Sequence, residues 1–160
     1  MQLYVLRHGI AEDAGPGRAD SVRALTPEGK EKLRRVLDRA KRADASPSLI
    51  LTSPYVRAVE TARMAAQRLE CKKAPVQTDA LLPFGSPERV WAEVCEHHDE
   101  EQVLLAGHEP LLGQFVSFVL DSPALRVDFK KGALVRIHVD RFGPAPHGVL
   151  VWMLTPKLAG

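Results

Sequence analysis

Short apolar runs alternate with longer amphipathic segments along this chain of 160 residues, and this alternation is the feature that most restricts its fold. Runs of strand length lie at residues 2–6, 49–52, 75–78 and 102–106, and helical patterns occupy much of the sequence between them. Such a pattern is typical of a mainly parallel sheet with helices on both faces. We therefore expect a three-layer α/β/α fold, formed as a single domain over residues 1–160.

Three predicted helices begin with a hydroxyl residue followed by proline, at Thr26-Pro27, Ser53-Pro54 and Ser86-Pro87. A hydroxyl suits the N-cap and proline suits the first helical position. In the first of these helices, one face carries Leu33, Val36, Leu37 and Ala40. In the second, the predicted apolar stripe is Val56, Val59, Ala62, Ala66 and Leu69. This stripe leaves Arg57 to one side, in the first turn of the helix.

The pattern changes in the C-terminal third of the chain. Residues 111–120 predict a buried helix, which is too short for the ~20 residues that span a bilayer. Ala133–Val139 and Val149–Leu154 are typical of two strands, and the segment from Gly143 to Gly148 between them is rich in turn residues. We expect these two strands to add an antiparallel edge to the sheet.

Charge and cysteine content exclude several classes of protein. The net charge of +2 provides no general attraction to nucleic acid or to anionic membranes. Cys71 and Cys95 fit neither a disulfide framework nor a zinc-site spacing. The first apolar run ends at Arg7 and is too short for a secretory signal. We expect a cytoplasmic protein without nucleic-acid or membrane partners, and a monomer, since no long exposed apolar helix demands a dimer.

The tripeptide Arg7-His8-Gly9 follows the first predicted strand directly. In an open α/β sheet, ligands bind beyond the carboxyl ends of the strands, where this tripeptide would lie. Arginine offers a planar fork for phosphate oxygens, histidine a nucleophile or base, and glycine a close approach of the backbone. Gly107-His108-Glu109-Pro110 follows another strand in the same way. If the two strands are neighbours, His8 and His108 could face one anion.

A third segment, from Thr52 to Ala62, again joins a strand to the start of a helix. The free amides of a first helical turn and the side chain of Arg57 both favour an anion at that point. Taken singly, Arg57 would be a solvated helix residue and His108 a structural histidine. Three such segments at one edge of a sheet instead favour a phosphate site.

In order and spacing, these motifs resemble the histidine phosphatase superfamily. The resemblance rests on Arg7-His8-Gly9, Ser53-Pro54-x-x-Arg57-Ala58-x-x-Thr61-Ala62 and Gly107-His108-Glu109-Pro110, and runs from residue 2 to about residue 120. The short length and the segment from Asp20 to Gly29 are similar to the phosphohistidine phosphatase branch of the SixA type.

The resemblance implies a covalent mechanism that needs no metal and no cofactor. His8 would attack phosphorus, and Arg7, Arg57 and a protonated His108 would hold the three equatorial oxygens. Attack requires an unprotonated ring nitrogen on His8, so a backbone carbonyl would have to fix the tautomer through the other nitrogen. Gly9 would allow close approach of the substrate. Arg23, which precedes a Leu-Thr pair as in that branch, would contact the phosphate or the protein substrate.

The sequence departs from the wider family at one informative position. Many members carry a glutamate acid in a Leu-x-Glu pattern between the second and third motifs, where Pro83 stands here. An alkoxide leaving group needs a proton donor, whereas phosphohistidine can leave as neutral imidazole. The expected substrate is therefore phosphohistidine on a phosphorelay protein. Glu12, Asp13 or Glu88 could still supply an acid from a neighbouring segment.

Three alternatives stay open at this point. The same four residues could hydrolyse a small phosphoester or phosphoanhydride. The domain could instead bind phosphorylated partners without catalysis, in which case it would form no acid-labile phosphoenzyme. Finally, the pair His97-His98 could bind zinc, although cations also suit the end of a helix.

Overall fold

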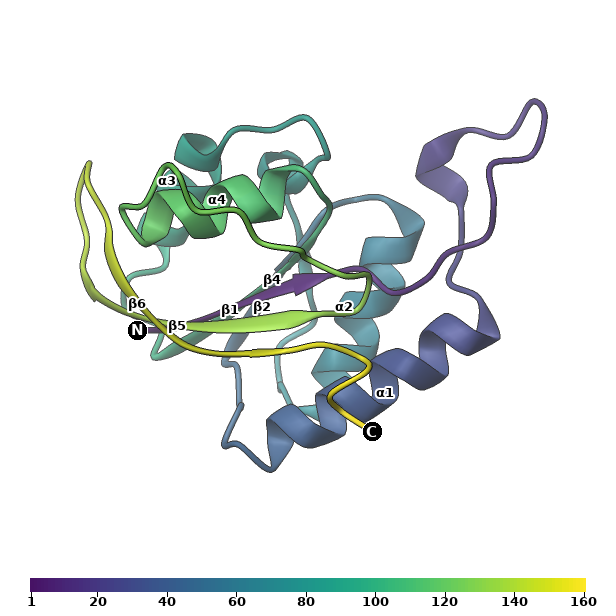
Figure 1. Ribbon diagram of the computed structural model, residues 1–160, viewed down its shortest axis with the longest axis horizontal. Helices are drawn as coiled ribbons and strands as arrows, with labels where there is room; N and C mark the ends of the chain where they lie inside the picture. The colour runs from purple at the N-terminus through teal and green to yellow at the C-terminus, as the bar shows by residue number, and fades with distance from the viewer.

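A six-stranded sheet lies between two layers of helices in the computed structural model, which describes residues 1–160 (Figure 1). The strands are β1 (Gln2–Arg7), β2 (Leu49–Thr52), β3 (Val76–Gln77), β4 (Gln102–Gly107), β5 (Leu134–Arg141) and β6 (His147–Leu154). The helices are α1 (Pro27–Lys41), α2 (Val56–Arg68), α3 (Pro87–Glu96) and α4 (Leu111–Val119), and the single 3-10 turns are η1 (Asp20–Val22) and η2 (Asp79–Leu81).

The sheet has the strand order β3-β2-β4-β1-β5-β6. The four strands from β3 to β1 run parallel, while β5 is antiparallel to β1 and β6 is antiparallel to β5. The predicted α/β/α fold with an antiparallel C-terminal edge is therefore confirmed. Each predicted strand is present, although the ends differ slightly, and β6 begins at His147 rather than Val149.

Two apolar clusters attach the helices to the two faces of the sheet. Because successive side chains of a strand point to opposite faces, Leu3 and Val5 of β1 pack with α3 and α4. Tyr4 and Leu6 of the same strand pack with α1 and α2 on the other face. β1 and β4 are buried on both faces, as expected of central parallel strands. The predicted buried helix is α4, and none of the helices combines the length and apolar character needed to cross a membrane.

Two of the three predicted helix caps are confirmed. The hydroxyl of Thr26 accepts a hydrogen bond from the first turn of α1 at 3.0 Å, and that of Ser86 accepts one from the first turn of α3 at 3.3 Å. The cap predicted at Ser53 is wrong, because α2 begins only at Val56. The Ser53 N–H still bonds to a carbonyl of β4 at 3.0 Å, so the chain remains extended there. Its hydroxyl is thereby left to face His108.

The apolar stripe predicted for α2 is also partly wrong. Its fully buried side chains are Arg57, Ala58, Thr61, Ala62 and Ala65, whereas Val56, Val59 and Ala66 are only half-buried. The helix turns its Arg57 and Thr61 face inward because Thr61 Oγ1 accepts the N–H of Gly9, directly after β1, at 3.2 Å. A polar contact with the segment beyond β1 thus decides the orientation of α2.

Candidate active site

The strand order β2-β4-β1 brings the three predicted motifs to one edge of the sheet. Arg7 is paired in register with Gly107, and the N–H of His8 donates to the carbonyl of Gly107 at 3.0 Å. The rings of His8 and His108 therefore lie side by side, with centroids 5.1 Å apart. The expectation that the two strands are neighbours is confirmed, and both histidines project beyond their carboxyl ends.

The hydrogen bonds of His8 define its tautomer. Nδ1 lies 2.7 Å from the carbonyl oxygen of Gly9, and Nε2 lies 3.2 Å from Nε of Arg57. A carbonyl only accepts and a guanidinium only donates, so the proton is on Nδ1 and the lone pair is on Nε2. Burial, together with the positive charges of Arg57 and Arg7, lowers the pKa of His8 to about 3 despite the Gly9 bond. His8 is thus a neutral imidazole with its nucleophilic nitrogen turned toward a cation.

His108 is almost completely buried, with 1% of its surface exposed. Its Nε2 lies 2.8 Å from the hydroxyl of Ser53, and the edge of Tyr55 approaches the ring at a centroid distance of 5.1 Å. Burial first, and then the neighbouring His8 and Arg57, lower the pKa of His108 to about 3. The ring is therefore neutral in this structure, whereas the resemblance implied a protonated His108. Its Nδ1 is buried and has no hydrogen-bond partner.

Arg57 is held by the segment between β1 and α1, which extends away from the body in Figure 1. Its Nη1 donates to the carbonyl of Asp20 at 2.8 Å and its Nη2 to the Asp20 carboxylate at 3.0 Å. This arrangement turns Nε toward His8. Partial burial opposes ionisation of Asp20, but the hydrogen bonds from Arg23 and Arg57 outweigh it and lower the pKa of Asp20. Asp20 is thus a charged brace for Arg57, a role that the sequence analysis did not assign.

Arg7, the last residue of β1, is the second cation beside His8. Its Nη1 donates to the carbonyl of Phe129 at 2.5 Å, whereas its Nε is buried without a hydrogen-bond partner. Buried polar atoms without partners are rare in folded proteins, and each one requires an explanation. Two of them, Arg7 Nε and His108 Nδ1, belong to residues that flank His8. A ligand rich in oxygen would satisfy both.

The two residues predicted to contact substrate, Arg23 and Gly9, occupy supporting positions. Arg23 donates to the Asp20 carboxylate at 2.7 Å, so it joins the site through Asp20. The N–H of Gly9 is bonded to Thr61 and is therefore occupied within the protein. A Cβ at Gly9 would lie 3.3 Å from the carbonyl of Gly29 at the start of α1. Gly9 thus packs closely against the start of α1, and its contact with a substrate stays a prediction.

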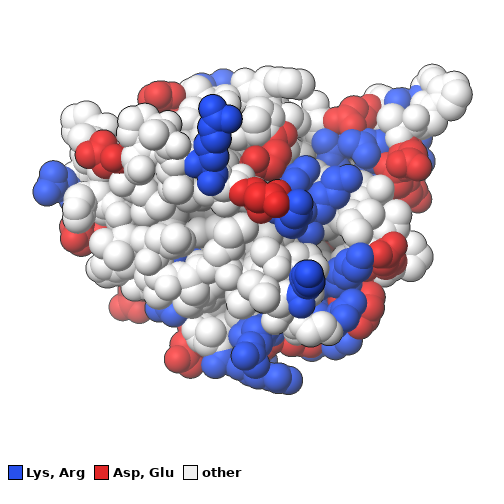
Figure 2. All heavy atoms as spheres, in the orientation of Figure 1, with Lys and Arg blue, Asp and Glu red and all other residues white.

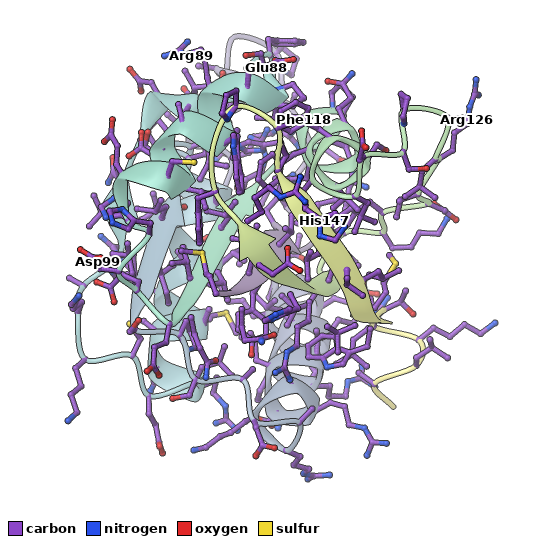
Figure 3. The ribbon with its side chains drawn as sticks, turned by 90° about the vertical axis from the view of Figure 1, so that its left-hand side faces the viewer. Glu88, Arg89, Asp99, Phe118, Arg126 and His147 are labelled. Atoms are coloured by element: carbon purple, nitrogen blue, oxygen red, sulfur yellow. The ribbon has the colours of Figure 1, made fainter.

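None of the three carboxylates considered as acids contacts the site. Glu12 forms an ion pair with Arg18 at 2.7 Å, and Asp13 is exposed. Glu88 lies at the outer edge of the molecule near the start of α3 (Figure 3). No hydrogen bond or ion pair joins any of them to Arg7, His8, Arg57 or His108. Pro83, which the resemblance places where many members carry a glutamate, is buried.

The sequence analysis missed one half-buried carboxylate, Glu109, which comes directly after His108. Its Oε1 accepts the N–H of Gly113 in the first turn of α4 at 2.6 Å. Burial raises the pKa of Glu109, opposed by that hydrogen bond and by the charge of Arg7. The signal that could have identified it is its position between a histidine and a helix start, where a carboxylate is favoured.

Known proteins with similar sequences and structures identify the family of this chain. The sequence pattern of the histidine phosphatase superfamily (branch 1) matches residues 3–83. A protein of Picosynechococcus sp. is 34% identical over 121 residues, which cover 74% of this chain and 73% of the relative. The phosphohistidine phosphatase SixA of Escherichia coli is 27% identical over 160 residues, covering 98% of this chain and 94% of that protein. The solved structure of the protein histidine phosphatase SixA complexed with tungstate superposes with a TM-score of 0.85, at 25% identity and with 98% of each chain covered. By its sequence, its fold and the residues at the edge of its sheet, the chain belongs to the histidine phosphatase superfamily and is a phosphatase of the SixA type.

Proposed function

We propose that this phosphatase hydrolyses phosphohistidine on a protein through a covalent intermediate on His8. The observation that carries the proposal is the neutral His8 ring, with its lone pair on Nε2, between two residues with unpartnered buried nitrogens. Tungstate, an oxyanion like phosphate, is bound by the related SixA structure, and a relative is named for activity on phosphohistidine. We take residues 1–160 as one monomeric cytoplasmic domain that serves a phosphorelay protein.

In the first step, the Nε2 lone pair of His8 forms a bond to phosphorus while the P–N bond of the substrate breaks. The bonding pair returns to the ring nitrogen of the substrate, which leaves as neutral imidazole when its other nitrogen carries a proton. In the second step, water attacks phosphorus and the bond to His8 breaks. Both protons of the water stay with the released phosphate, and His8 leaves in its neutral form with the proton still on Nδ1.

The cations around His8 would stabilise the charge on the transferring group. An incoming phosphoryl dianion favours the protonated form of a neighbouring imidazole, so the pKa of His108 should rise on binding. His108 Nδ1 and Arg7 Nε would then donate to phosphoryl oxygens, and Arg57 Nε would turn from His8 to a third oxygen. Such prearranged donors are commonly the largest contribution to catalysis of this type.

The absence of a positioned acid at the site also favours a phosphohistidine substrate. By the resemblance, Pro83 stands where the family's acid is expected, and no hydrogen bond or ion pair joins Glu12, Asp13 or Glu88 to the four site residues. A phosphoester with an alkoxide leaving group would need a proton at that stage. One observation favours this second candidate: Glu109 has a raised pKa and interacts with Arg7. If Glu109 served as the acid, alkyl phosphates would be hydrolysed well and Glu109→Gln would abolish that reaction.

The test compares phosphate release from a protein carrying phosphohistidine with release from an alkyl phosphate and an aryl phosphate. Native protein, His8→Ala and the control His147→Ala, which changes an exposed histidine, are measured side by side. We expect rapid release from phosphohistidine alone, loss of that release in His8→Ala, and an acid-labile phosphoenzyme in the native protein. Faster release from the phosphate esters than from phosphohistidine would contradict the assignment of phosphohistidine as the substrate. Absence of any phosphoenzyme or release would instead favour a module that binds phosphorylated partners.

A further inference from the structure

A groove of about 910 Å³ lies next to the active site, between the end of β1 and the C-terminal segment. Six of its lining side chains are cations and one, Asp128, is acidic; the cations are Arg7, Lys32, Arg35, Lys130, Lys131 and Lys157. We call it the basic groove. Figure 2 shows Lys and Arg side chains gathered in the centre and lower right of this face. Since the whole chain has a net charge of only +2, this excess of positive charge is local.

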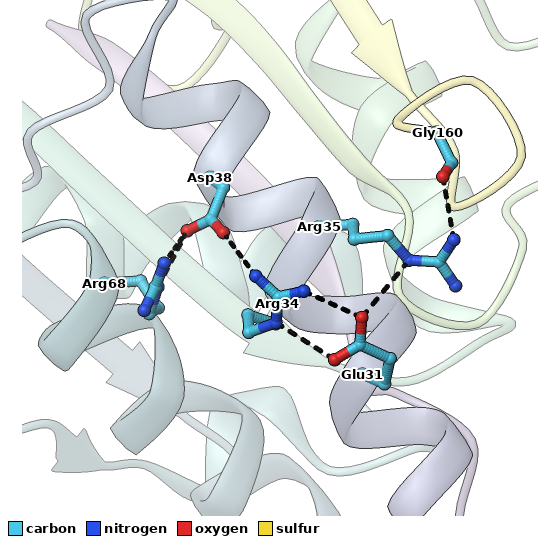
Figure 4. Close-up of polar contacts among 6 residues, drawn as sticks. All are labelled: Glu31, Arg34, Arg35, Asp38, Arg68 and Gly160. Carbon is cyan, nitrogen blue, oxygen red and sulfur yellow. Dashed lines mark hydrogen bonds and ion pairs between the residues drawn. The ribbon is translucent and has the colours of Figure 1, made fainter.

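The fold assembles the basic groove from distant parts of the sequence. Lys32 and Arg35 come from α1, Lys130 from the segment before β5, and Lys157 from the segment after β6. Arg35 fixes one wall, because its Nη1 donates to the carbonyl of Gly160 at 2.7 Å (Figure 4). This bond ties the end of the chain to α1 and closes the groove on that side.

Part of the charge in the basic groove is available to a partner, although Lys32 pairs with Glu28 and Arg35 with Glu31. Lys131 and Lys157 form no ion pair. Lys130 pairs with Asp128 at 2.8 Å, but both side chains are largely exposed. Exposed pairs of this kind contribute at most ~1 kcal/mol and exchange readily for another anion.

The basic groove adjoins the active site and shares Arg7 with it. Arg7 lines the groove and also flanks His8. The charge of Lys131 reaches His8 as well, where it contributes to the lowered pKa of that ring. A substrate with its phosphoryl group at His8 would therefore place the neighbouring part of its surface over the groove.

Resting on the proposed function, we propose that the basic groove binds acidic side chains that neighbour the phosphohistidine of the protein substrate. A compact phosphate is best held by converging arginine forks and backbone amides. Here Arg35 is engaged by Gly160, and the remaining cations outside the active site are lysines spread over three segments. Point charges spread in this way suit several carboxylates distributed along a polypeptide better than one small polyanion. They would also steer an acidic protein toward the site.

The experiment uses two synthetic peptides with one central phosphohistidine each, flanked by glutamates in the first and by glutamines in the second. The groove variant is Lys130→Gln with Lys157→Gln, chosen because neither lysine contributes to the pKa of His8. The control is Lys72→Gln with Arg141→Gln, which removes the same charge from exposed residues that form no ion pair and do not line the basic groove.

We expect native protein to prefer the glutamate peptide, and kcat/KM for that peptide to fall about fivefold in the groove variant, the sum of two exposed charge contacts. Activity on the glutamine peptide, and both activities of the control variant, should be unchanged. Equal rates on the two peptides would overturn the groove proposal and leave the proposed function standing. Hydrolysis of neither peptide would overturn both. Hydrolysis of tripolyphosphate is measured in parallel. If the groove variant lost activity on tripolyphosphate but not on the glutamate peptide, the occupant of the groove would be a small polyanion.

Discussion

Two groups of basic side chains in this molecule differ in how their nitrogens are satisfied. On the surface of α1 and α2, Arg34 bonds to Glu31 and to Asp38 at 2.8 and 3.0 Å, and Arg68 bonds to the same Asp38 (Figure 4). At the active site, Arg7 Nε and His108 Nδ1 are buried without a partner. An unpaired buried polar group destabilises a fold by ~1–3 kcal/mol, so the second group is a cost to stability that a ligand can recover. The contrast separates basic side chains held by surface ion pairs from the two at the active site that keep a nitrogen without a partner.

The largest expected effect comes from Arg57→Lys, which keeps the charge and removes the planar fork. Lysine cannot bond to Asp20 twice and also present a donor beside His8. We expect kcat on a phosphohistidine protein to fall by a factor of about 100 to 1000, as for the loss of one transition-state donor elsewhere. The matched control is Arg34→Lys on the surface of α1, for which activity should stay within twofold of native.

The comparison would break if Arg57→Lys kept native activity. Charge alone would then be sufficient at this position, and the bonds from Asp20 would have no bearing on catalysis. Loss of activity in Arg34→Lys would also contradict the comparison, since a surface ion pair would then influence the reaction.

Much of this architecture could be predicted because the relevant signals are local. The apolar runs predict the strands, and Thr26-Pro27 and Ser86-Pro87 predict the starts of α1 and α3. The site could be located because the carboxyl ends of parallel strands meet at one edge of the sheet, which places His8 beside His108.

The features that could not be predicted depend on contacts between distant segments. Asp20 braces Arg57 across 37 residues of sequence, and no local pattern records that contact. Ser53 resembles a helix cap by sequence, but its bond to β4 keeps the chain extended and frees its hydroxyl for His108. The neutrality of His108 results from burial among cations, which only the assembled site shows.

The second prediction concerns the effect of acid on stability. The pKa values of His8 and His108 are lowered to about 3 in the folded protein, from an ordinary value of 6.5. Between about pH 6 and pH 4 the unfolded chain therefore binds protons that the folded chain does not, and stability falls as the pH falls. Each histidine should contribute a slope of up to about 1.4 kcal/mol per pH unit to the free energy of unfolding.

Urea unfolding at several pH values measures this slope. In the double variant His8→Asn with His108→Asn, the slope of the free energy of unfolding against pH should be smaller than in native protein by up to about 2.7 kcal/mol per pH unit. His98→Asn, which changes an exposed histidine at the end of α3, should leave the slope as it is. If the double variant kept the native slope, the two rings would not be held neutral by the fold, and the contrast with the surface cations would lose its energetic basis.

The smallest expected effect comes from comparing substitutions of two aspartates, each of which bonds to two arginines. Asp20 binds Arg23 and Arg57 at the active site, while Asp38 binds Arg34 and Arg68 on the surface. Asp20→Asn keeps an oxygen for Arg57 and removes the charge, so we expect kcat to fall up to about tenfold, with little change in KM, because Arg57 loses orientation rather than contact with the substrate. Asp38→Asn should leave kcat unchanged and reduce stability by at most ~1 kcal/mol. A rise in kcat/KM for Asp20→Asn would give the opposite answer: Asp20 would then compete with phosphate for Arg57, and the site cation would be masked by its aspartate instead of positioned by it.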